Sequence, residues 1–349
     1  MRPKFCAWPA LFLLVLGTTG CGSFLARRMA QAPNTYPAWL APRAPVELAF
    51  AENFLTNFPA HFADVGPPPA RLRYRVVEPA DYRVAVSSTN WLERGQTHFR
   101  FSLEATLPGR PNVWTAAPRG TVALLHGHGV SLFAMAPWAL RLAQEGWRCV
   151  LVDLRGHGQS TGRRIYFGVQ EARDLSQLLD ALARDGPLAR PVAAMGESYG
   201  AALALRWKTA EPRVDSVVAI APYAVLSNAV LNIRHEYAHW FPQGLVKAGL
   251  KHLPSVLKVN PTELDTTTVL ARRPVAALFV AGGEDKIVPV SDVRKLYEES
   301  ATGSEWIVVP GATHEAVPYF FENLVNPVLT WLEGKREQQG RETGSRSSE

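Results

Sequence analysis

Short, uninterrupted runs of apolar residues recur through the last two thirds of the chain. They lie at residues 121–125, 148–152, 192–195, 217–220, 276–280 and 306–309. Continuous apolar runs of this length are typical of strands that are buried on both faces of a parallel sheet. Segments with helical spacing separate them, for example residues 168–184, where Val169, Ala172 and Leu175 share one face. The alternation predicts a βαβ series and therefore an α/β fold with a mostly parallel central sheet flanked by helices.

The remaining segments predict the domain organisation around this core. Alternating apolar and polar residues indicate earlier strands at residues 72–77, 82–86 and 97–103. Residues 222–273 are too long for a simple crossover, and we interpret them as a helical cap inserted between the sixth and seventh strands of the sheet. The predicted α/β core therefore consists of residues 71–221 and 274–334. We expect residues 21–70, which are rich in proline, to form a tether and N-terminal extension, and the polar residues 335–349 to be a disordered tail.

Composition and charge narrow the class of protein. The 349 residues are 47% hydrophobic and 19% charged, which is enough apolar material for a packed core and excludes a wholly disordered chain. The net charge of +6 is spread thinly and forms no basic run, so we expect no nucleic-acid partner. A positive net charge of this size mildly favours binding to an anionic membrane surface. The sequence indicates no cofactor and leaves the oligomeric state open.

The N-terminus has the order of a secretory signal. Residues 1–20 run from basic residues through an apolar stretch to small residues, which predicts a cleaved signal peptide. The next segment, Gly20-Cys21-Gly22-Ser23, resembles the lipobox of bacterial lipoproteins, although Thr18 stands where that pattern prefers leucine. The resemblance implies that Cys21 is acylated and that the protein is anchored in the cell envelope outside the cytoplasm, in the outer membrane if the source is Gram-negative. The alternative is cleavage nearby, with Cys21 an incidental thiol.

Three residues in strand-following loops suggest nucleophilic catalysis. The segment Gly196-Glu197-Ser198-Tyr199-Gly200 lies between an apolar strand and an apolar helix, as the turn around a nucleophilic serine requires. Asp285 and His314 each follow a later predicted strand, at the sheet edge where open α/β sheets place their sites. We therefore predict Ser198 as nucleophile, His314 as base and Asp285 as the orienting acid, with the adjacent Glu284 as a weaker candidate for the acid.

Further motifs carry a family resemblance over residues 119–333. His126-Gly127-His128-Gly129 and the segment from Asp153 to Ser160 (Asp-Leu-Arg-Gly-His-Gly-Gln-Ser) are similar to blocks of the α/β-hydrolase superfamily, nearest to its monoglyceride-lipase and lysophospholipase-like branch. The resemblance implies an α/β-hydrolase fold and a serine hydrolase of carboxylic esters, of the carboxylesterase type (EC 3.1.1). It also implies that the backbone N–H groups of His128 and Tyr199 bind the oxyanion.

The substrate is less determined than the reaction. We expect an ester with an apolar acyl group, bound under the cap near Trp240 and Phe241. Thioester and amide substrates remain open, and a fold of this kind could also serve as a non-catalytic binding protein of the envelope.

One motif favours a different chemistry. His235-Glu236-Tyr237-Ala238-His239 is a complete H-E-x-x-H sequence, which on a helix presents two imidazoles to zinc with the glutamate as base. Glu263 is the available carboxylate for a third ligand. A zinc peptidase is therefore the alternative enzyme, although a location inside a cap insert is unusual for such a site, and we predict no metal.

Overall fold

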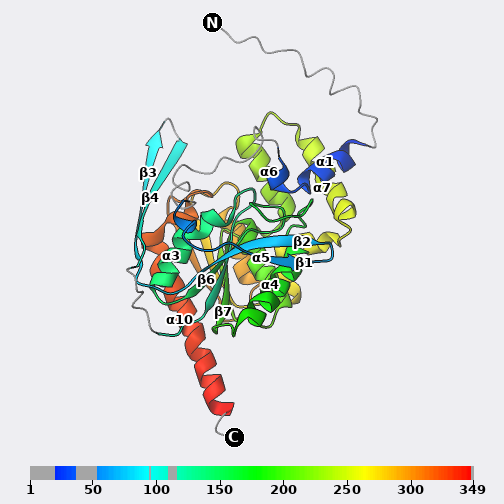
Figure 1. Cartoon of the computed structure of the whole chain (residues 1–349). Helices are drawn as coiled ribbons and strands as arrows, with labels where there is room; N and C mark the ends of the chain where they lie inside the picture. The colour runs from blue at the N-terminus through cyan, green and yellow to red at the C-terminus, as the bar shows by residue number, and fades with distance from the viewer. Residues whose placement is uncertain (1–19, 37–52, 94–95, 109–115, 347–349) are drawn as a thin grey trace.

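A single eight-stranded sheet forms the centre of the molecule. The computed structural model describes residues 20–36, 53–93, 96–108 and 116–346, and the strands of its main sheet are ordered β1-β2-β6-β5-β7-β8-β9-β10 (Figure 1). Their bounds are β1 His61–Val65, β2 Ala70–Val77, β5 Thr121–Leu125, β6 Arg148–Val152, β7 Val192–Glu197, β8 Ser216–Ile220, β9 Leu278–Gly282 and β10 Glu305–Val309. Strands β1, β2 and β6 pair antiparallel and all other neighbours pair parallel. The expected mostly parallel sheet is confirmed.

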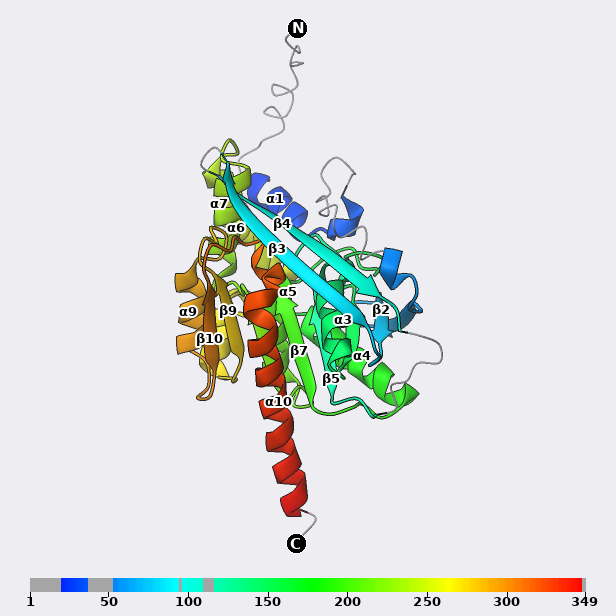
Figure 2. The ribbon, with the colours of Figure 1, turned by 90° about the vertical axis from the view of Figure 1, so that its left-hand side faces the viewer.

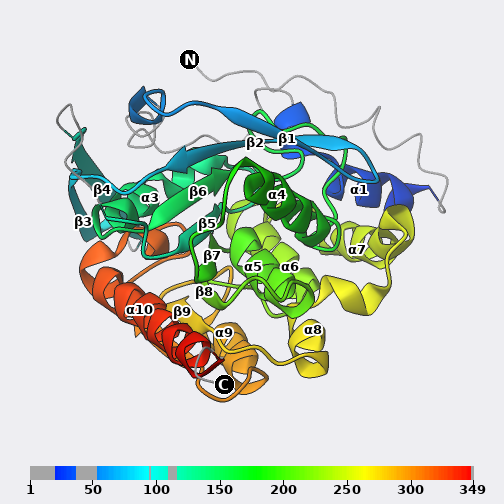
Figure 3. The same ribbon diagram turned by 60° about the horizontal axis from the view of Figure 1, so that its bottom comes forward.

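Helices cover both faces of this sheet. Because side chains alternate along a strand, Val122 and Leu124 of β5 pack on one face while Ala123 and Leu125 pack on the other. The first face is covered by α3 (Ala136–Gln144) and α10 (Phe321–Arg346). The second is covered by α4 (Glu171–Asp185), α5 (Tyr199–Ala210), α8 (Thr266–Arg272) and α9 (Val290–Glu298) (Figure 3). The result is a three-layer arrangement with two apolar cores.

A long hairpin lies outside the main sheet. Strands β3 (Arg83–Glu93) and β4 (Gln96–Thr106) pair only with each other and cross the side of the molecule that carries α10 (Figure 2). Phe101 of β4 stacks on Tyr319 of the short helix η4 (Val317–Tyr319), with ring centroids 4.2 Å apart. The hairpin thus supports the segment that follows His314.

The insert between β8 and β9 is helical. It contains α6 (Leu226–Tyr237), α7 (Gln243–Leu257) and the short helix η3 (Pro261–Leu264), followed by α8. In the main sheet β8 and β9 are the sixth and seventh strands in chain order, so the cap occupies the expected position.

The described parts of the segment 21–70, residues 21–36 and 53–70, form elements of the fold where we expected a tether and N-terminal extension, and residues 37–52 lie outside the described ranges. Helix α1 (Cys21–Met29) lies against α7, and the short helix η1 (Pro33–Thr35) follows it (Figure 1). The close approach depends on small residues: a Cβ at Gly249 of α7 would lie 3.0 Å from Leu25 Cγ. Strand β1 also belongs to the sheet rather than to an extension. The predicted signal peptide lies outside the described residues except for Gly20.

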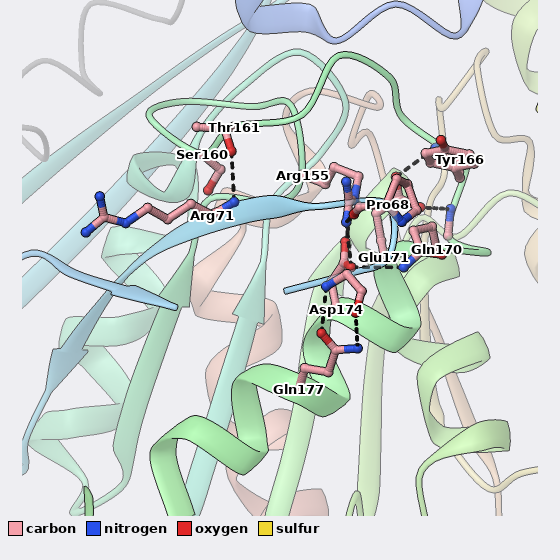
Figure 4. Close-up of polar contacts among 12 residues, drawn as sticks. Pro68, Arg71, Arg155, Ser160, Thr161, Tyr166, Gln170, Glu171, Asp174 and Gln177 are labelled. Atoms are coloured by element: carbon pink, nitrogen blue, oxygen red, sulfur yellow. Dashed lines mark hydrogen bonds and ion pairs between the residues drawn. The ribbon is translucent and has the colours of Figure 1, made fainter. Parts of the chain in front are cut away.

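The loop after β6 is held by buried ion pairs. Arg155 donates to both carboxylate oxygens of Asp174 on α4, at 2.6 and 2.8 Å, and to the carbonyl of Pro68 (Figure 4). Glu171 accepts the N–H groups of Tyr166 and Gly168. These bonds join the loop after β6 to α4 and to the turn between β1 and β2.

The C-terminal segment also differs from its prediction. Helix α10 continues to Arg346, where we expected a disordered tail from residue 335 (Figure 2). Residues 333–342 are rich in glutamate, lysine, arginine and glutamine, which are strong helix formers. None of the helices within the described ranges combines the length and hydrophobicity that crossing a bilayer requires.

Candidate active site

The turn between β7 and α5 presents Ser198 at the carboxyl edge of the sheet. Ser198 has φ 50°, a left-handed conformation that is strained for a residue with a side chain. Both flanking glycines are needed for this turn. A Cβ at Gly196 would lie 2.3 Å from the carbonyl carbon of Gly200, and a Cβ at Gly200 would lie 2.2 Å from the carbonyl oxygen of Leu125. Steric crowding at the turn therefore requires glycine at both positions of the Gly-x-Ser-x-Gly pattern.

The structure brings Ser198, His314 and Asp285 into one hydrogen-bonded chain. His314 Nε2 lies 2.9 Å from Ser198 Oγ, and His314 Nδ1 lies 2.7 Å from Asp285 Oδ2. Because a carboxylate only accepts hydrogen bonds, Nδ1 carries the proton and Nε2 is left to accept the serine hydroxyl. This tautomer is the one that can take a proton from a nucleophile.

Asp285 is fixed by its own loop. Its Oδ1 accepts the N–H groups of Ile287 and Val288 at 2.8 and 2.7 Å, so Oδ2 is directed at His314. The side chain of Asp285 is buried, whereas that of Glu284 is exposed. The geometry therefore favours Asp285 over Glu284 as the orienting acid.

The surroundings of His314 stabilise its protonated form. Burial acts to lower the pKa of this imidazole, but the hydrogen bond and charge of Asp285, with smaller contributions from Glu315 and Glu197, outweigh it and raise the pKa above its ordinary value of 6.5. If His314 is the base, kcat/KM should rise with pH as His314 loses its proton.

Replacing Asp285 tests this electrostatic assignment. In Asp285→Asn the burial of His314 remains while the main stabilising charge is gone, so the acidic limb of the pH profile should move to lower pH. We also expect kcat to fall by about 10⁴-fold, because the amide favours the wrong imidazole tautomer. A profile of kcat/KM from pH 5 to 9 measures both effects, and an unmoved acidic limb would contradict the assignment.

The loop after β5 is fixed by two buried side chains. His126 Nε2 accepts the N–H of Leu154 at 3.0 Å while its Nδ1 lies 2.7 Å from the carbonyl oxygen of Gly127. Glu197 Oε1 accepts the N–H of Gly127 at 3.1 Å. Burial raises the pKa of Glu197, opposed by this N–H and by His314. Sequence reasoning missed Glu197, whose role is visible only once β5 and β7 are known to be neighbours.

The two predicted oxyanion residues lie beside the serine. Tyr199 is the first residue of α5, so its N–H has no acceptor within the helix, and the positive end of the helix dipole points at Ser198. His128 lines the cavities at Ser198, and its ring meets that of Tyr199 edge-on at 6.1 Å. Both residues therefore lie at the apolar cavity that borders Ser198.

Two cavities meet at Ser198. The His314 cavity has a volume of about 440 Å³ and contains the polar groups of Glu197, His314 and Glu315. The apolar cavity has a volume of about 270 Å³. Four residues border both cavities: His128, Ser198, Ile233 and Ile287.

The cap residues that line these cavities differ from those we expected. Trp240 and Phe241 border neither cavity, and Trp240 is 76% exposed. Helix α6 ends at Tyr237, which places both residues in the turn before α7. Ile233 and Tyr237 of α6 take the position over the serine instead. Tyr237 donates to Glu315 on the body.

The H-E-x-x-H sequence does not form the helical pair that zinc requires. Because α6 ends at Tyr237, His239 lies beyond the helix and does not share a helical face with His235. Glu236 instead lies 3.6 Å from Lys286, and Glu263 accepts the N–H of Asn260 at the start of η3. After Tyr237 the chain turns, and Arg234 of α6 donates to the carbonyls of His239 and Phe241 in this turn.

The chain is similar to several known proteins. Residues 116–269 match the family Hydrolase_4, described as serine aminopeptidase, S33. The chain is 25% identical over 184 residues to the uncharacterized protein YqkD of Bacillus subtilis, covering 51% of this chain and 59% of YqkD. It is 25% identical over 261 residues to a monoacylglycerol lipase of Mycolicibacterium smegmatis, covering 63% of this chain and 91% of the lipase.

A solved structure supports the fold. The esterase Pf2001 of Pyrococcus furiosus superimposes with a TM-score of 0.56 at 20% identity, over 85% of this chain and 98% of the esterase. Together with the strand order, this likeness shows that the chain has the α/β-hydrolase fold. The expected fold is therefore confirmed, and the chain is similar to hydrolases of that superfamily.

Proposed function

We propose that this α/β hydrolase cleaves carboxylic esters through an acyl-enzyme formed on Ser198. The observation that carries the proposal is the hydrogen-bonded chain from Ser198 through His314 to Asp285, placed where two cavities meet. The names of the similar monoacylglycerol lipase and of the esterase Pf2001 support an ester as the substrate. The apolar cavity favours a hydrocarbon acyl group.

The reaction follows from the hydrogen bonds. His314 Nε2 takes the proton of Ser198 Oγ as the oxygen attacks the ester carbonyl. The N–H groups of His128 and Tyr199 stabilise the oxyanion, with a single such donor contributing about 3–4 kcal/mol. His314 then gives its proton to the leaving alcohol, and a water activated by the same imidazole hydrolyses the acyl-enzyme. Asp285 stays ionised and holds the imidazole in position.

A substrate panel tests the proposed reaction. The purified chain should react with a fluorophosphonate probe and hydrolyse p-nitrophenyl acyl esters, with EDTA having no effect on turnover. Acyl thioesters and aminoacyl p-nitroanilides extend the panel, the latter because the matching family is described as a serine aminopeptidase. Cleavage of the anilides without cleavage of any ester would replace the proposed ester substrate by an amide. Loss of activity in EDTA with recovery in zinc would favour the metallopeptidase.

We further propose that Cys21 is acylated and anchors the chain to a membrane of the cell envelope. The lipobox-like sequence supports this, and three acyl chains on one cysteine are ample for stable attachment at about 0.8 kcal/mol per buried CH₂.

Replacing Cys21 tests the anchor. The mature protein should begin at Cys21 and enter the detergent phase of Triton X-114, and Cys21→Ser should lose that partition. Cys149→Ser is a suitable control, because Cys149 is fully buried on β6 and cannot carry a lipid in the folded protein. A mature chain with another first residue or an unmodified Cys21 would contradict the anchor.

A further inference from the structure

We propose that the segment Cys21–Tyr36, which begins at the proposed anchoring cysteine, forms the outer wall of the acyl site and limits the length of the acyl chain. This inference rests on the proposed esterase function. The observation that supports it is that Met29 and Tyr36 line the apolar cavity, together with residues of the core and the cap.

The position of His314 decides which cavity takes the acyl chain. The leaving alcohol must be within reach of His314, because this imidazole protonates it. His314 borders the His314 cavity and not the apolar cavity. The alcohol therefore occupies the His314 cavity, and the acyl chain extends from Ser198 into the apolar cavity.

The apolar cavity has the chemistry of a hydrocarbon site. Apart from Ser198 and His128, its surface is formed by aliphatic and aromatic side chains, including Phe167, Leu226, Val230 and Val288. Phe167 comes from the loop after β6, Leu226 and Val230 come from helix α6 of the cap, and Val288 comes from the loop after β9. The remaining side is closed by Met29 and Tyr36.

The segment Cys21–Tyr36 is bonded to the body between the two wall residues Met29 and Tyr36. Backbone bonds join it to the loop after β6: Ala32 N–H donates to the carbonyl of Arg163 at 3.2 Å, and Ile165 N–H to the carbonyl of Ala30 at 2.9 Å. The side chain of Asn34 donates to the carbonyl of Ser160 at 2.8 Å. A wall held in this way can set a length limit, because it does not swing away from a longer chain.

Met29 is placed between the cap and the cavity. A Cβ at Gly249 of α7 would lie 3.1 Å from Met29 Cε, so the thioether end lies directly on the cap helix. Leu25, one turn earlier on α1, faces the same glycine, with its Cγ 3.0 Å from the position of that Cβ, but does not border the cavity. The two side chains therefore share their helix–helix contact and differ in contact with the substrate.

That difference supplies a matched pair of variants. Met29→Ala should enlarge the apolar cavity and move the preferred acyl chain of p-nitrophenyl esters about two carbons upward. Each methylene newly accommodated is worth about fourfold in kcat/KM, so the ratio of the longer to the shorter ester should rise about fifteenfold. Leu25→Ala loosens the same contact of α1 with α7 and should leave that ratio as in the wild type. Tyr36→Ala opens the wall from its other end and should act in the same direction as Met29→Ala.

A binding measurement separates this inference from the proposed reaction. Binding to the Ser198→Ala variant is measured by competition between saturated fatty acids of six to fourteen carbons and a fluorescent fatty acid. This assay requires no turnover. Met29→Ala added to Ser198→Ala should shift the preferred length upward as in the kinetic assay. If fatty acids bind with this shift but the wild type hydrolyses no ester, the proposed function fails and the assignment of the wall holds. Equal length profiles for wild type, Met29→Ala and Tyr36→Ala, or an equal shift in Leu25→Ala, overturn the wall.

Discussion

Ser198→Ala should reduce ester hydrolysis by about 10⁴- to 10⁶-fold and abolish labelling by a fluorophosphonate. The loss is this large because nucleophile and base act as a unit, so that removing one disables the other. What remains is the contribution of the oxyanion donors and of substrate binding. Alanine is smaller than serine and tolerates the turn no worse, so the fold should be retained.

The measurement needs a control for the strained turn. Circular dichroism and the thermal midpoint of Ser198→Ala should match those of the wild type, since φ 50° is imposed by the surrounding turn rather than by the hydroxyl. His314→Ala should reduce ester hydrolysis by a similar factor. The double variant of Ser198→Ala and His314→Ala should be little less active than either single variant. Persistent labelling of Ser198→Ala at another residue would place the nucleophile elsewhere.

Asp153→Asn should lower the free energy of unfolding by about 3–5 kcal/mol, the typical result of leaving a buried charge without its partner. Asp153 directly follows β6 and pairs with Arg73 of β2, whose Nε lies 2.7 Å from its Oδ2. Both side chains are almost fully buried, at 2% and 0% exposure. The same carboxylate accepts the N–H groups of Leu132 and Gln159, each at 2.8 Å. Asparagine keeps the volume of the side chain, so the loss is electrostatic rather than the result of a cavity.

Urea unfolding at constant pH measures this change, with Glu298→Ala as the control. Glu298 also pairs with an arginine, since its Oε1 lies 3.0 Å from Arg294 Nε. The side chains of Arg294 and Glu298 are 64% and 59% exposed, however. Such a surface pair contributes less than about 1 kcal/mol. Equal losses in the two variants would contradict the view that burial makes the Asp153 pair important. The double variant Arg73→Met with Asp153→Asn should recover part of the loss, because it removes the unpaired charge of Arg73 while the amide oxygen of residue 153 can still accept a backbone N–H.

The sequence predicted those parts of the molecule whose signal is local. Strands β5 and β6 are found where the apolar runs predict them, because a strand buried on both faces needs no polar position. Ser198, Asp285 and His314 could be located because each lies in a turn or loop that follows a predicted strand, and the sheet topology brings these strand ends together. Strand β10, which precedes His314, is a partly exposed edge strand rather than one buried on both faces. Strand β1 was missed: its sequence His-Phe-Ala-Asp-Val alternates only weakly, and it is stabilised by antiparallel pairing with β2.

The parts that sequence reasoning missed depend on packing between distant segments. Helix α1 has few large apolar residues to mark it, and its partner α7 lies more than 200 residues further along the chain. In the cap, we predicted a pocket at Trp240 and Phe241 because these aromatic residues are large and apolar. Which cap residues face Ser198 is decided by how α6 rests on the body, and one contact that sets this is the bond from Asn232 to the carbonyl of Ile287.

The docking of α1 on α7 also bears on how the protein folds. These two helices have one of the largest sequence separations of any contact in the described chain, and contacts of this kind form late because a long loop must be closed first. The β-α units that carry Ser198, Asp285 and His314 are joined by shorter loops. We expect a refolding chain to recover reactivity toward a small probe before it distinguishes acyl lengths. Chain-length discrimination would then be the last property that the enzyme acquires, and the first that local unfolding of its N-terminal helix would remove.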